Sequence, residues 1–455
     1  MQTNQVKNIH IISIGGSVMH DLAISLKKLG NLVTGSDDII YDPSKSKLKS
    51  KGLLPKQFGY FKNNIHDKID LVITGMHTKK NNIELNEARK KNIPILSYPE
   101  YISKLSENKH RIVIAGSHGK TTITSIIMHV LKFNKIKFDY IIGAKANGFK
   151  NNISLSNSPI IIIEGDEYLS SPLDQSPKFL KYNHHIALIN GIEWDHFNVF
   201  KNEKVYIKQF DKLIKMTPKG GEIIYFQNDK VLLDLLEKYN NEDTFIKPFN
   251  YEKALLYRKS AYIFDENNKK IKLNVFGRHN MQNISGAKLV CEQLGIKHKN
   301  FYKAIKSYSL PEKRLQKIYE KKITIFKDFA HSPSKLKATI DAVKNQYKKK
   351  LLSIYELHSS SSFNFKFLEK YHNSLIDSDY SIIYISKKKT HLFSEKISEK
   401  KLKKLFNDKR IKLVNSVNSL KKIISSNKYK EYNKLFMSSG NFDDFKIDKY
   451  YNDSK

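Results

Sequence analysis

A short glycine loop between an apolar strand and a helix constrains this chain more than any other feature. Residues 114–122 read Ile-Ala-Gly-Ser-His-Gly-Lys-Thr-Thr. Val113 and Ile114 supply the end of a strand, and residues 123–131 have the apolar composition of a buried helix. A loop of this kind aims several backbone N–H groups at a phosphate. The spacing Gly-x-x-Gly-Lys-Thr is shorter than that of the standard P-loop, which has four residues between its glycines.

The residues of this loop have distinct expected roles at a nucleotide. We expect Lys120 to reach the β- and γ-phosphates and the Thr121 hydroxyl to contribute to a Mg²⁺ site. An ordinary glycine turn before a helix is the alternative, but Lys-Thr-Thr at the start of the helix favours a phosphate site. The remaining loop residues expected to bind the nucleotide are Gly116, Ser117, His118, Gly119 and Thr122.

Length and charge bound the class of protein. The 455 residues predict two or three domains. A net charge of +35 points toward nucleic acid as a partner. However, the lysines are spread through every segment and there are only six arginines, the residue preferred for specific phosphate and base recognition. We therefore expect no nucleic-acid partner, and a P-loop ATPase acting on nucleic acid stays as the alternative from a different class.

Compartment and cysteine content agree with an enzyme of the cytoplasm. No apolar run approaches the roughly 20 residues of a membrane helix, and the N-terminal residues lack the apolar core of a signal peptide. The single cysteine, Cys291, excludes an internal disulfide. We expect a cytoplasmic chain with no membrane partner, as a monomer or a weak homo-oligomer.

The first segment, 1–108, alternates strands and helices in the manner of a Rossmann-like half. An apolar strand at 9–14 leads to the turn Gly15-Gly16-Ser17, a helical pattern at 18–29 follows, and the strand 32–37 ends in Asp37. The glycine fingerprint is degraded, because Ser13 and Val18 stand where glycines would. This is a weak dinucleotide signal, but the turn and Asp37 remain candidates for binding a nucleotide sugar.

The second segment, 109–313, predicts a central parallel sheet. The buried strand 159–164 ends in Glu164, and the strand 186–190 ends in Asn190 and is followed by Asp195-His196. Ligands of such sheets lie beyond the carboxyl ends of the strands. Glu164, Asn190 and His196 are therefore expected to converge near Lys120, with Glu164 holding Mg²⁺ opposite Thr121.

Polar groups near the end of the second segment and the start of the third are further candidates. Arg278 and Asn280 open an apolar helix, where Asn280 and Asn283 could bind an adenine edge or simply cap the helix. Arg314 lies at a predicted domain junction, where a cation could reach a γ-phosphate when domains close. The third segment, 314–455, repeats the alternation of strands and helices, and its strand 324–328 ends in Asp328. We expect a loop at 359–362 and a frayed tail from residue 448.

These blocks, in this order, resemble the Mur ligase superfamily, the ATP-dependent amide ligases of bacterial cell-wall synthesis. The resemblance rests on five blocks of sequence, which are the glycine loop at 115–122, Asn190 with Asp195-His196, Gly277-Arg278-His279-Asn280, Arg314, and Asp328-Phe329-Ala330-His331-Ser332-Pro333. It implies an α/β fold of three domains: a Rossmann-like UDP-N-acetylmuramate domain (1–108), a central P-loop ATPase with a parallel sheet (109–313), and a Rossmann-like amino acid or peptide domain (314–455).

Within the superfamily, the segments at 11–19 and 35–37 resemble those of the UDP-N-acetylmuramate users. The sequence from Glu164 to Tyr168 is similar to that of the murein peptide ligases, which add L-alanyl-γ-D-glutamyl-meso-diaminopimelate; the ligases that add L-alanine are the alternative. The resemblance implies ATP and Mg²⁺ as cofactors and an acyl-phosphate intermediate.

The resemblance also implies roles for residues of all three segments. The catalytic set would be Lys120, Glu164, His196 and Arg314, with Thr121, Glu164 and His196 as metal ligands. Asn190, Arg278, Asn280 and Asp328 would contact ATP. The substrate-binding set would be Gly15, Gly16, Ser17, Asp37, His331 and His358. His358 departs from the pattern, because the peptide ligases have an arginine there.

Overall fold

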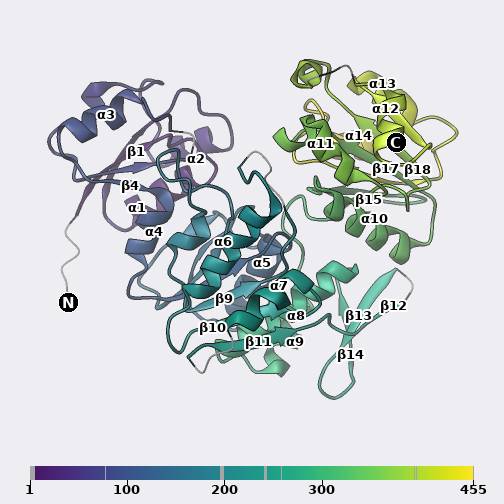
Figure 1. The fold of residues 1–455 in the computed structure, drawn as a ribbon, viewed down its shortest axis with the longest axis horizontal. Helices are drawn as coiled ribbons and strands as arrows, with labels where there is room; N and C mark the ends of the chain where they lie inside the picture. The colour runs from purple at the N-terminus through teal and green to yellow at the C-terminus, as the bar shows by residue number, and fades with distance from the viewer. Residues whose placement is uncertain are drawn as a thin grey trace. The chain divides into compact units, whose positions relative to one another are not determined.

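The computed structural model of the protein describes residues 6–76, 78–194, 199–239, 243–257, 259–393, 395 and 397–453. The chain divides into two compact units, and Figure 1 shows the ribbon coloured along the chain. The first unit comprises Met1–Glu193, Glu203–Asn250 and Gly286–Phe301, and the second comprises Trp194–Asn202, Tyr251–Ser285 and Tyr302–Lys455.

A four-stranded parallel sheet with the order β2-β1-β3-β4 opens the first unit. Its interior is apolar, since Ile11, Val72 and Ile73 are fully buried. The strands are β1 (Asn8–Ile12), β2 (Leu32–Ser36), β3 (Leu71–Thr74) and β4 (Ile95–Ser97), and the helices are α1 (Met19–Lys28), α2 (Ser44–Ser50), α3 (Ile83–Lys90) and α4 (Tyr98–Leu105).

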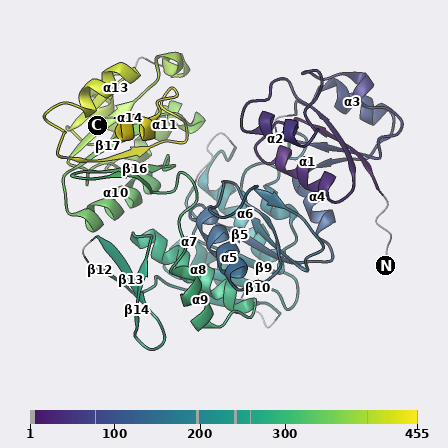
Figure 2. The ribbon, with the colours of Figure 1, turned by 180° about the vertical axis from the view of Figure 1, so that it is seen from behind.

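A seven-stranded sheet with the order β11-β10-β9-β5-β8-β6-β7 forms the rest of the first unit, and all its pairs are parallel except β6–β7. Helices cover both faces, with α6 nearer the viewer in Figure 1 and α5 nearer the viewer in Figure 2. The strands are β5 (His110–Ala115), β6 (Asp139–Ile141), β7 (Ile153–Ser154), β8 (Ile160–Glu164), β9 (Ile186–Ile189), β10 (Glu222–Phe226) and β11 (Phe245–Phe249), and the helices are α5 (Lys120–Phe133), α6 (Glu203–Lys215) and α7 (Lys230–Leu236).

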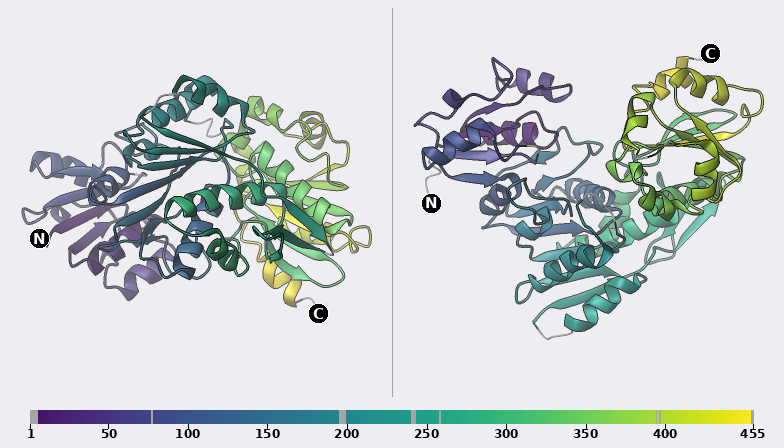
Figure 3. Two further views of the ribbon diagram at one scale, coloured as in Figure 1. Left: turned by 90° about the horizontal axis from the view of Figure 1, so that it is seen from below. Right: turned by 45° about the horizontal axis from the view of Figure 1, so that its top comes forward.

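The second unit holds a small antiparallel sheet, β12-β13-β14, and a six-stranded sheet with the order β15-β16-β20-β17-β18-β19 (Figure 3). Only the β15–β16 pair of the larger sheet is antiparallel. The strands are β12 (Ala254–Tyr257), β13 (Ser260–Phe264), β14 (Lys270–Leu273), β15 (Gln316–Glu320), β16 (Thr324–Asp328), β17 (Leu351–Glu356), β18 (Tyr380–Tyr384), β19 (Ile411–Val414) and β20 (Asn433–Met437).

In the described residues seven α-helices follow β14; α8 begins in the second unit and continues into the first, and α9 begins in the first and continues into the second. They are α8 (Arg278–Gln293), α9 (His298–Ile305), α10 (Pro333–Tyr347), α11 (Phe365–Leu368), α12 (Glu399–Leu405), α13 (Val417–Ile424) and α14 (Ile447–Asp453). The short 3-10 segments in the part of the chain that the structure describes are Lys62–Asn64, Lys178–Lys181, Glu237–Tyr239, Ser360–Phe363, Glu369–Tyr371 and Lys387–Leu392.

The predicted α/β class with parallel sheets is confirmed, and the differences are local. The first strand ends at Ile12 rather than at residue 14, because Ser13 adopts a φ of 65° and turns the chain. The expected frayed tail is wrong: it forms helix α14, whose Tyr450 and Tyr451 pack on a buried apolar cluster of the C-terminal sheet. The antiparallel sheet β12-β13-β14 was not expected from the sequence.

Within the described ranges, no helix combines the length and the apolar composition needed to cross a bilayer.

Candidate active site

The phosphate loop, residues 116–119, joins β5 to α5. Gly116 and Gly119 have φ angles of 111° and 75°, which disfavour L side chains. A Cβ atom on Gly116 would lie 2.7 Å from the backbone N of Asn190, at the end of the neighbouring strand β9. The loop is therefore held close to that strand, and only glycine fits at position 116.

Lys120 is the first residue of α5, and its ammonium lies over the loop. Its Nζ lies 2.5 Å from Glu167 Oε2 and donates a hydrogen bond of 2.8 Å to the carbonyl of Gly116. Burial by itself lowers the pKa of Lys120, but the charge of Glu167, with smaller contributions from Asp166 and Glu164, outweighs it and raises the pKa. The side chain is thus a cation at neutral pH, held against the backbone of the loop.

Thr121 and Glu164 meet as expected from the order of the strands. The Thr121 hydroxyl donates to Glu164 Oε1 at 2.7 Å, and Glu164 Oε2 accepts from the backbone N of Gly143 at 2.7 Å. A hydroxyl and a carboxylate at a helix N-terminus are oxygen donors of the kind that Mg²⁺ prefers, so these two residues fit the ion.

The third expected metal ligand, His196, and its neighbour Asp195 lie outside the described residues. The described part of the chain contains no group of three or more His, Cys, Asp or Glu side chains that could hold a metal by themselves. The metal assignment therefore remains a prediction.

Asn190 and His118 also meet in the loop. The Asn190 amide donates to the carbonyl of His118 at 3.1 Å, and His118 Nε2 lies 2.8 Å from Glu193 Oε2. Ser117 is buried; its hydroxyl lies 2.8 Å from Tyr206 OH and accepts from the backbone N of Glu193. The loop is thus fixed from β9 and α6. Thr122, in the first turn of α5, is also buried.

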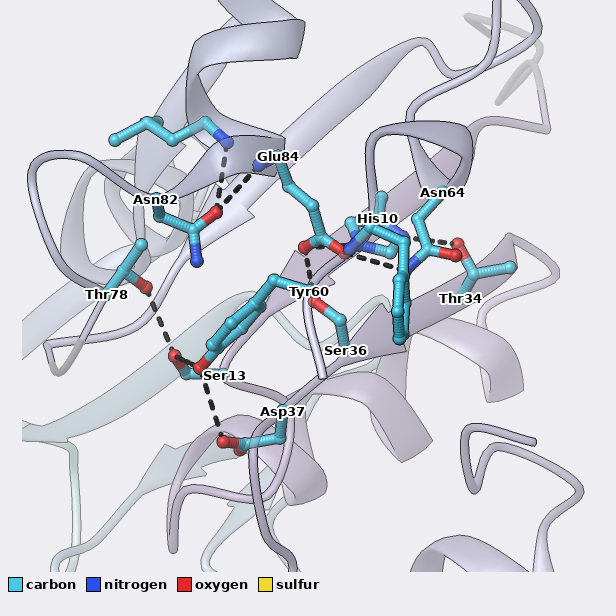
Figure 4. A network of polar contacts seen from close by, with 12 residues as sticks. His10, Ser13, Thr34, Ser36, Asp37, Tyr60, Asn64, Thr78, Asn82 and Glu84 are labelled. Atoms are coloured by element: carbon cyan, nitrogen blue, oxygen red, sulfur yellow. Dashed lines mark hydrogen bonds and ion pairs between the residues drawn. The ribbon is translucent and has the colours of Figure 1, made fainter. Parts of the chain in front are cut away.

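The N-terminal glycine turn, residues 13–18, is built differently (Figure 4). The backbone N of Gly15 donates to Asp37 Oδ2 at 2.8 Å, directly after β2. Ser13 takes the left-handed conformation that the missing glycine would have supplied, and its hydroxyl lies 3.2 Å from Tyr60 OH and 3.3 Å from Thr78 Oγ1. Burial raises the pKa of Asp37. Gly15 thus bonds to the carboxyl of Asp37, which lies in a cluster with the hydroxyls of Ser13, Tyr60 and Thr78.

In the second unit, Arg278 and Asn280 lie at the start of α8. The guanidinium of Arg278 lies 4.3 Å from the ring centre of Tyr251. Asn280 is buried, and its amide donates to the carbonyl of Phe276 at 2.7 Å while its Oδ1 accepts from Asn283 at 3.3 Å. These contacts lie at the start of α8, and the choice between helix capping and adenine binding by this pair stays open.

In the second unit, Arg314 and Asp328 are connected through the residues next to them in the chain. Arg314 contacts Phe329, and Asp328 contacts Leu315. The Arg314 guanidinium lies 4.8 Å from the ring centre of Phe329. Asp328 Oδ2 accepts from the backbone N of Leu315 at 2.5 Å, and its Oδ1 accepts from the backbone N of Ala330 at 2.7 Å. Asp328 thus ties the segment that carries Arg314 to the end of β16.

The carboxyl ends of β17 and β20 hold a third polar cluster. Glu356 is buried and accepts from Ser438 and from the backbone N of Phe442, and its Oε1 lies 3.3 Å from His358 Nδ1. Lys389 Nζ lies 2.8 Å from the same Nδ1. A Cβ atom on Gly440 would lie 2.2 Å from the His358 ring, so the ring packs directly on that glycine.

His331 contributes mainly through its backbone. Its carbonyl accepts from Tyr371 OH at 2.6 Å and from Tyr355 OH at 3.1 Å, and its Nδ1 lies 2.8 Å from the carbonyl of Phe329. These contacts fix the loop that follows β16.

Sequence reasoning missed several residues that fix these groups. Glu167 stood in an acidic cluster, but nothing in the sequence distinguished it from Asp166 as the partner of Lys120. Glu193 lies between two quoted motifs and could have been found there. Tyr206 and Lys389 carry no local signal, because each meets its partner from a separate helical segment.

Comparisons with known proteins agree with this geometry. A family model described as "Mur ligase family, catalytic domain" matches residues 8–110, and one described as "Mur ligase middle domain" matches residues 114–291. A UDP-N-acetylmuramate--L-alanine ligase of Dictyoglomus turgidum is 30% identical over 77% of this chain and 76% of its own. A UDP-N-acetylmuramate--L-alanyl-gamma-D-glutamyl-meso-2,6-diaminoheptandioate ligase of Haemophilus influenzae is 29% identical over 75% of this chain and 77% of its own.

Solved structures of both kinds of ligase share the fold. The UDP-N-acetylmuramate:L-alanyl-gamma-D-glutamyl-meso-diaminopimelate ligase of Neisseria meningitides matches with a TM-score of 0.61 at 25% identity, over 67% of this chain and 99% of that one. The UDP-N-acetylmuramate-alanine ligase of Thermotoga maritima matches with a TM-score of 0.73 at 22% identity, over 99% of this chain and all of that one. The chain therefore belongs to the Mur ligase family and is an ATP-dependent amide ligase.

Proposed function

We propose that this ligase joins the lactyl carboxylate of UDP-N-acetylmuramate to the α-amine of L-alanyl-γ-D-glutamyl-meso-diaminopimelate. The observation that carries the reaction class is the ammonium of Lys120, buried against Glu167 directly above the phosphate loop. A cation fixed there stabilises charge on the γ-phosphate as it is transferred.

The proposed chemistry has two steps. A carboxylate oxygen of UDP-N-acetylmuramate attacks the γ-phosphorus of ATP, so that an acyl phosphate forms and ADP leaves. The amine nitrogen of the acceptor then attacks the acyl carbon, and inorganic phosphate leaves as the amide forms and the nitrogen loses a proton. Lys120 neutralises the β- and γ-oxygens, and the loop N–H groups orient them.

The resemblance to the family gives further residues supporting roles in this reaction. Arg278 and Arg314 would add cations, and Asn190, Asn280 and Asp328 would contact the adenosine or its phosphates. Thr121 and Glu164, with His196 as the third predicted ligand, would hold Mg²⁺, which polarises phosphoryl oxygens when bound. The three-domain division at 108/109 and 313/314 is part of the same proposal, with the donor in the first domain and the acceptor in the third.

The acceptor is the finer part of the proposal. The tripeptide carries several carboxylates, and Lys389 with His358 places cationic and hydrogen-bonding groups at the strand ends where the acceptor would bind. The similarity of residues 164–168 to the peptide ligases supports the same acceptor. L-Alanine is the second candidate, because relatives named as L-alanine ligases are 30% identical to this chain.

An acceptor panel tests the proposal. The full chain is incubated with ATP, Mg²⁺ and UDP-N-acetylmuramate together with the tripeptide, L-alanine, glycine or L-serine, and ADP and the amide product are measured. We expect kcat/KM for the tripeptide to exceed that for L-alanine by at least about tenfold, a difference of about 1.4 kcal/mol in the transition state. A preference for L-alanine would establish the second candidate instead, and no product with any acceptor would reject both.

A further inference from the structure

Asp21, in the first turn of α1, is a buried carboxylate that contacts its own helix and two other segments. Its side chain is fully buried, and its Oδ2 accepts from the backbone N of Asn152 at 2.6 Å. Lys47 Nζ, from α2, donates to its Oδ1 at 3.0 Å. His20 Nε2 lies 3.3 Å from the same oxygen, an ion pair when the imidazole is protonated. Burying a carboxylate costs desolvation free energy, so packing alone does not account for an aspartate at this position.

That place is the boundary between the two sheets of the first unit. Asn152 directly precedes β7, the edge strand of the central sheet, whereas Asp21 belongs to the helix that follows the N-terminal glycine turn. Ser25, one turn further along α1, donates its hydroxyl to the carbonyl of Ile153 at 3.2 Å. Helix α1 is thus held to β7 at two points, of which only Asp21 is charged.

From Asp21, contacts lead back to the N-terminal glycine turn. The adjacent His20 donates its backbone N to the carbonyl of Gly16 at 3.1 Å, and its Nδ1 lies 2.8 Å from the same carbonyl. A displacement of the first turn of α1 therefore moves the turn in which the sugar nucleotide would bind.

From Asp21, contacts also lead forward to the phosphate loop. The carbonyl of Asn152 accepts from the backbone N of Ile142, and the next residue, Gly143, donates to Glu164 Oε2 at 2.7 Å. The other oxygen of Glu164 accepts from the Thr121 hydroxyl. Hydrogen bonds and short stretches of backbone thus connect Asp21 to the first turn of α5.

We propose that Asp21 is a positioning residue that couples sugar-nucleotide binding at the N-terminal glycine turn to ATP binding at the phosphate loop. The inference rests on the proposed function, because it takes UDP-N-acetylmuramate as the ligand of that turn. Burial by itself raises the pKa of Asp21, but the hydrogen bonds from His20 and Asn152 and the charges nearby outweigh it and lower the pKa, so the group is ionised at neutral pH. Coupling of two sites is reciprocal, so each ligand increases the binding affinity of the other by the same factor.

The test measures that factor by calorimetry on the full chain. The dissociation constant of a non-hydrolysable ATP analogue with Mg²⁺ is measured with and without saturating UDP-N-acetylmuramate. We expect the wild-type factor to be about fivefold or more, within the usual range of coupling between sites. In Asp21→Ala, which removes the acceptor of the Asn152 N–H, we expect the factor to fall at least threefold. Asp21→Asn keeps an acceptor oxygen, so its coupling factor should lie between those of the wild type and Asp21→Ala. This variant replaces Asp21→Ala if the alanine variant does not fold.

Lys47→Met is the matched control. It removes the same buried ion pair but leaves the hydrogen bond between Asp21 and Asn152, so we expect it to lower stability while the coupling factor stays at the wild-type value. Three results would overturn the inference but leave the proposed function standing. They are a wild-type coupling factor of one, a factor in Asp21→Ala within threefold of wild type, and an equal fall of the factor in Lys47→Met. If UDP-N-acetylmuramate does not bind the wild type at all, the proposed function is wrong, and the inference falls with it.

Discussion

The first unit contains two strand–turn–helix junctions that share a backbone plan and differ in their side chains. Both β1 and β5 end in a glycine turn that leads into a helix, and the N-terminus of a helix favours an anion. The turn after β5 adds Lys120 and Thr121 at the helix start, whereas the turn after β1 adds His20 and Asp21 and keeps Gly15 bonded to Asp37. Under the proposed function both turns receive a phosphate, and the comparison then teaches that the first helical turn distinguishes the junction that binds phosphate from the one that transfers it.

The largest expected effect comes from removing the feature that separates the two junctions. In Lys120→Ala, we expect the ATPase activity that depends on UDP-N-acetylmuramate to fall by at least about 10³-fold, because a fixed cation at a phosphoryl group is worth several kcal/mol. Binding of UDP-N-acetylmuramate, measured by calorimetry, should change by less than about twofold. Lys132→Ala, at the other end of α5, is the control. Activity of Lys120→Ala within tenfold of wild type would show that the comparison assigns the wrong residue.

Glycine-to-alanine changes test the backbone half of the comparison. Gly116 has a φ of 111° and no room for a Cβ beside the backbone of Asn190, so Gly116→Ala should lower the free energy of unfolding by about 3 kcal/mol. Gly16 has no such φ, and its Cβ would lie 3.3 Å from the flexible Met19 side chain and 3.5 Å, an ordinary contact distance, from the carbonyl of Ser13, so Gly16→Ala should cost less than about 1 kcal/mol. Urea unfolding of the two variants measures both values. Equal losses would mean that the two turns are constrained alike.

The two sheets that carry the junctions should lose stability at different pH values. His184, before β9, is buried, and its pKa is lowered to about 4, chiefly by burial and secondarily by the charges of His185 and Arg111. The folded pKa lies below the unfolded value of 6.5, so the unfolded chain binds more protons, and stability present above pH 6.5 is lost as the pH falls toward 4. The loss is about 3 kcal/mol over that window.

The N-terminal sheet should respond at lower pH. Burial by itself raises the pKa of Glu84, but hydrogen bonds from His10, Ser36 and Asn64 lower it below 4.5, so that its contribution is lost only as the pH falls below that value. Hydrogen exchange, corrected for intrinsic rates, is measured at pH 7.5 and 5.0. On lowering the pH to 5.0, the amides of β9 and its neighbours should lose more protection than those of β1 and β3. His184→Gln should remove most of the difference. Equal opening of both sheets at pH 5.0 would contradict this account.

The smallest expected effect concerns one hydroxyl at the N-terminal glycine turn. Tyr60 OH lies 3.2 Å from Ser13 Oγ and donates to Asp37 Oδ1 at 3.4 Å, both long hydrogen bonds (Figure 4). Tyr60→Phe should raise KM for UDP-N-acetylmuramate by about two- to fivefold, and KM for ATP should not change. A change in KM for ATP instead would show that Tyr60 serves the phosphate loop.

The difference between the two junctions also marks what the sequence could predict. The phosphate loop was readable because its functional groups are contiguous, and Glu164 and Asn190 followed from the rule that parallel strands end at one edge. The N-terminal glycine turn was only partly readable: Ser13 lacked the expected glycine, and its positive φ emerges only from the folded backbone.

Contacts between distant elements were not predictable. Nothing in the sequence pairs Asp21 with Asn152, or Ser117 with Tyr206, because each pair forms only when separate elements pack together. The tail was wrongly expected to fray for a related reason. Its polar composition hides Tyr450 and Tyr451, whose packing on the C-terminal sheet outweighs the weak helical signal.

Isotope transfer tests the central claim most directly. That claim is that ATP bound at the phosphate loop phosphorylates the carboxylate of UDP-N-acetylmuramate. UDP-N-acetylmuramate labelled with ¹⁸O in its lactyl carboxylate is turned over with ATP, Mg²⁺ and the preferred acceptor, and the released phosphate is analysed by mass spectrometry. The account predicts that each phosphate released during amide formation carries ¹⁸O from the carboxylate, since the acyl phosphate breaks at the carbonyl carbon. Amide formation with unlabelled phosphate would contradict an acyl-phosphate intermediate.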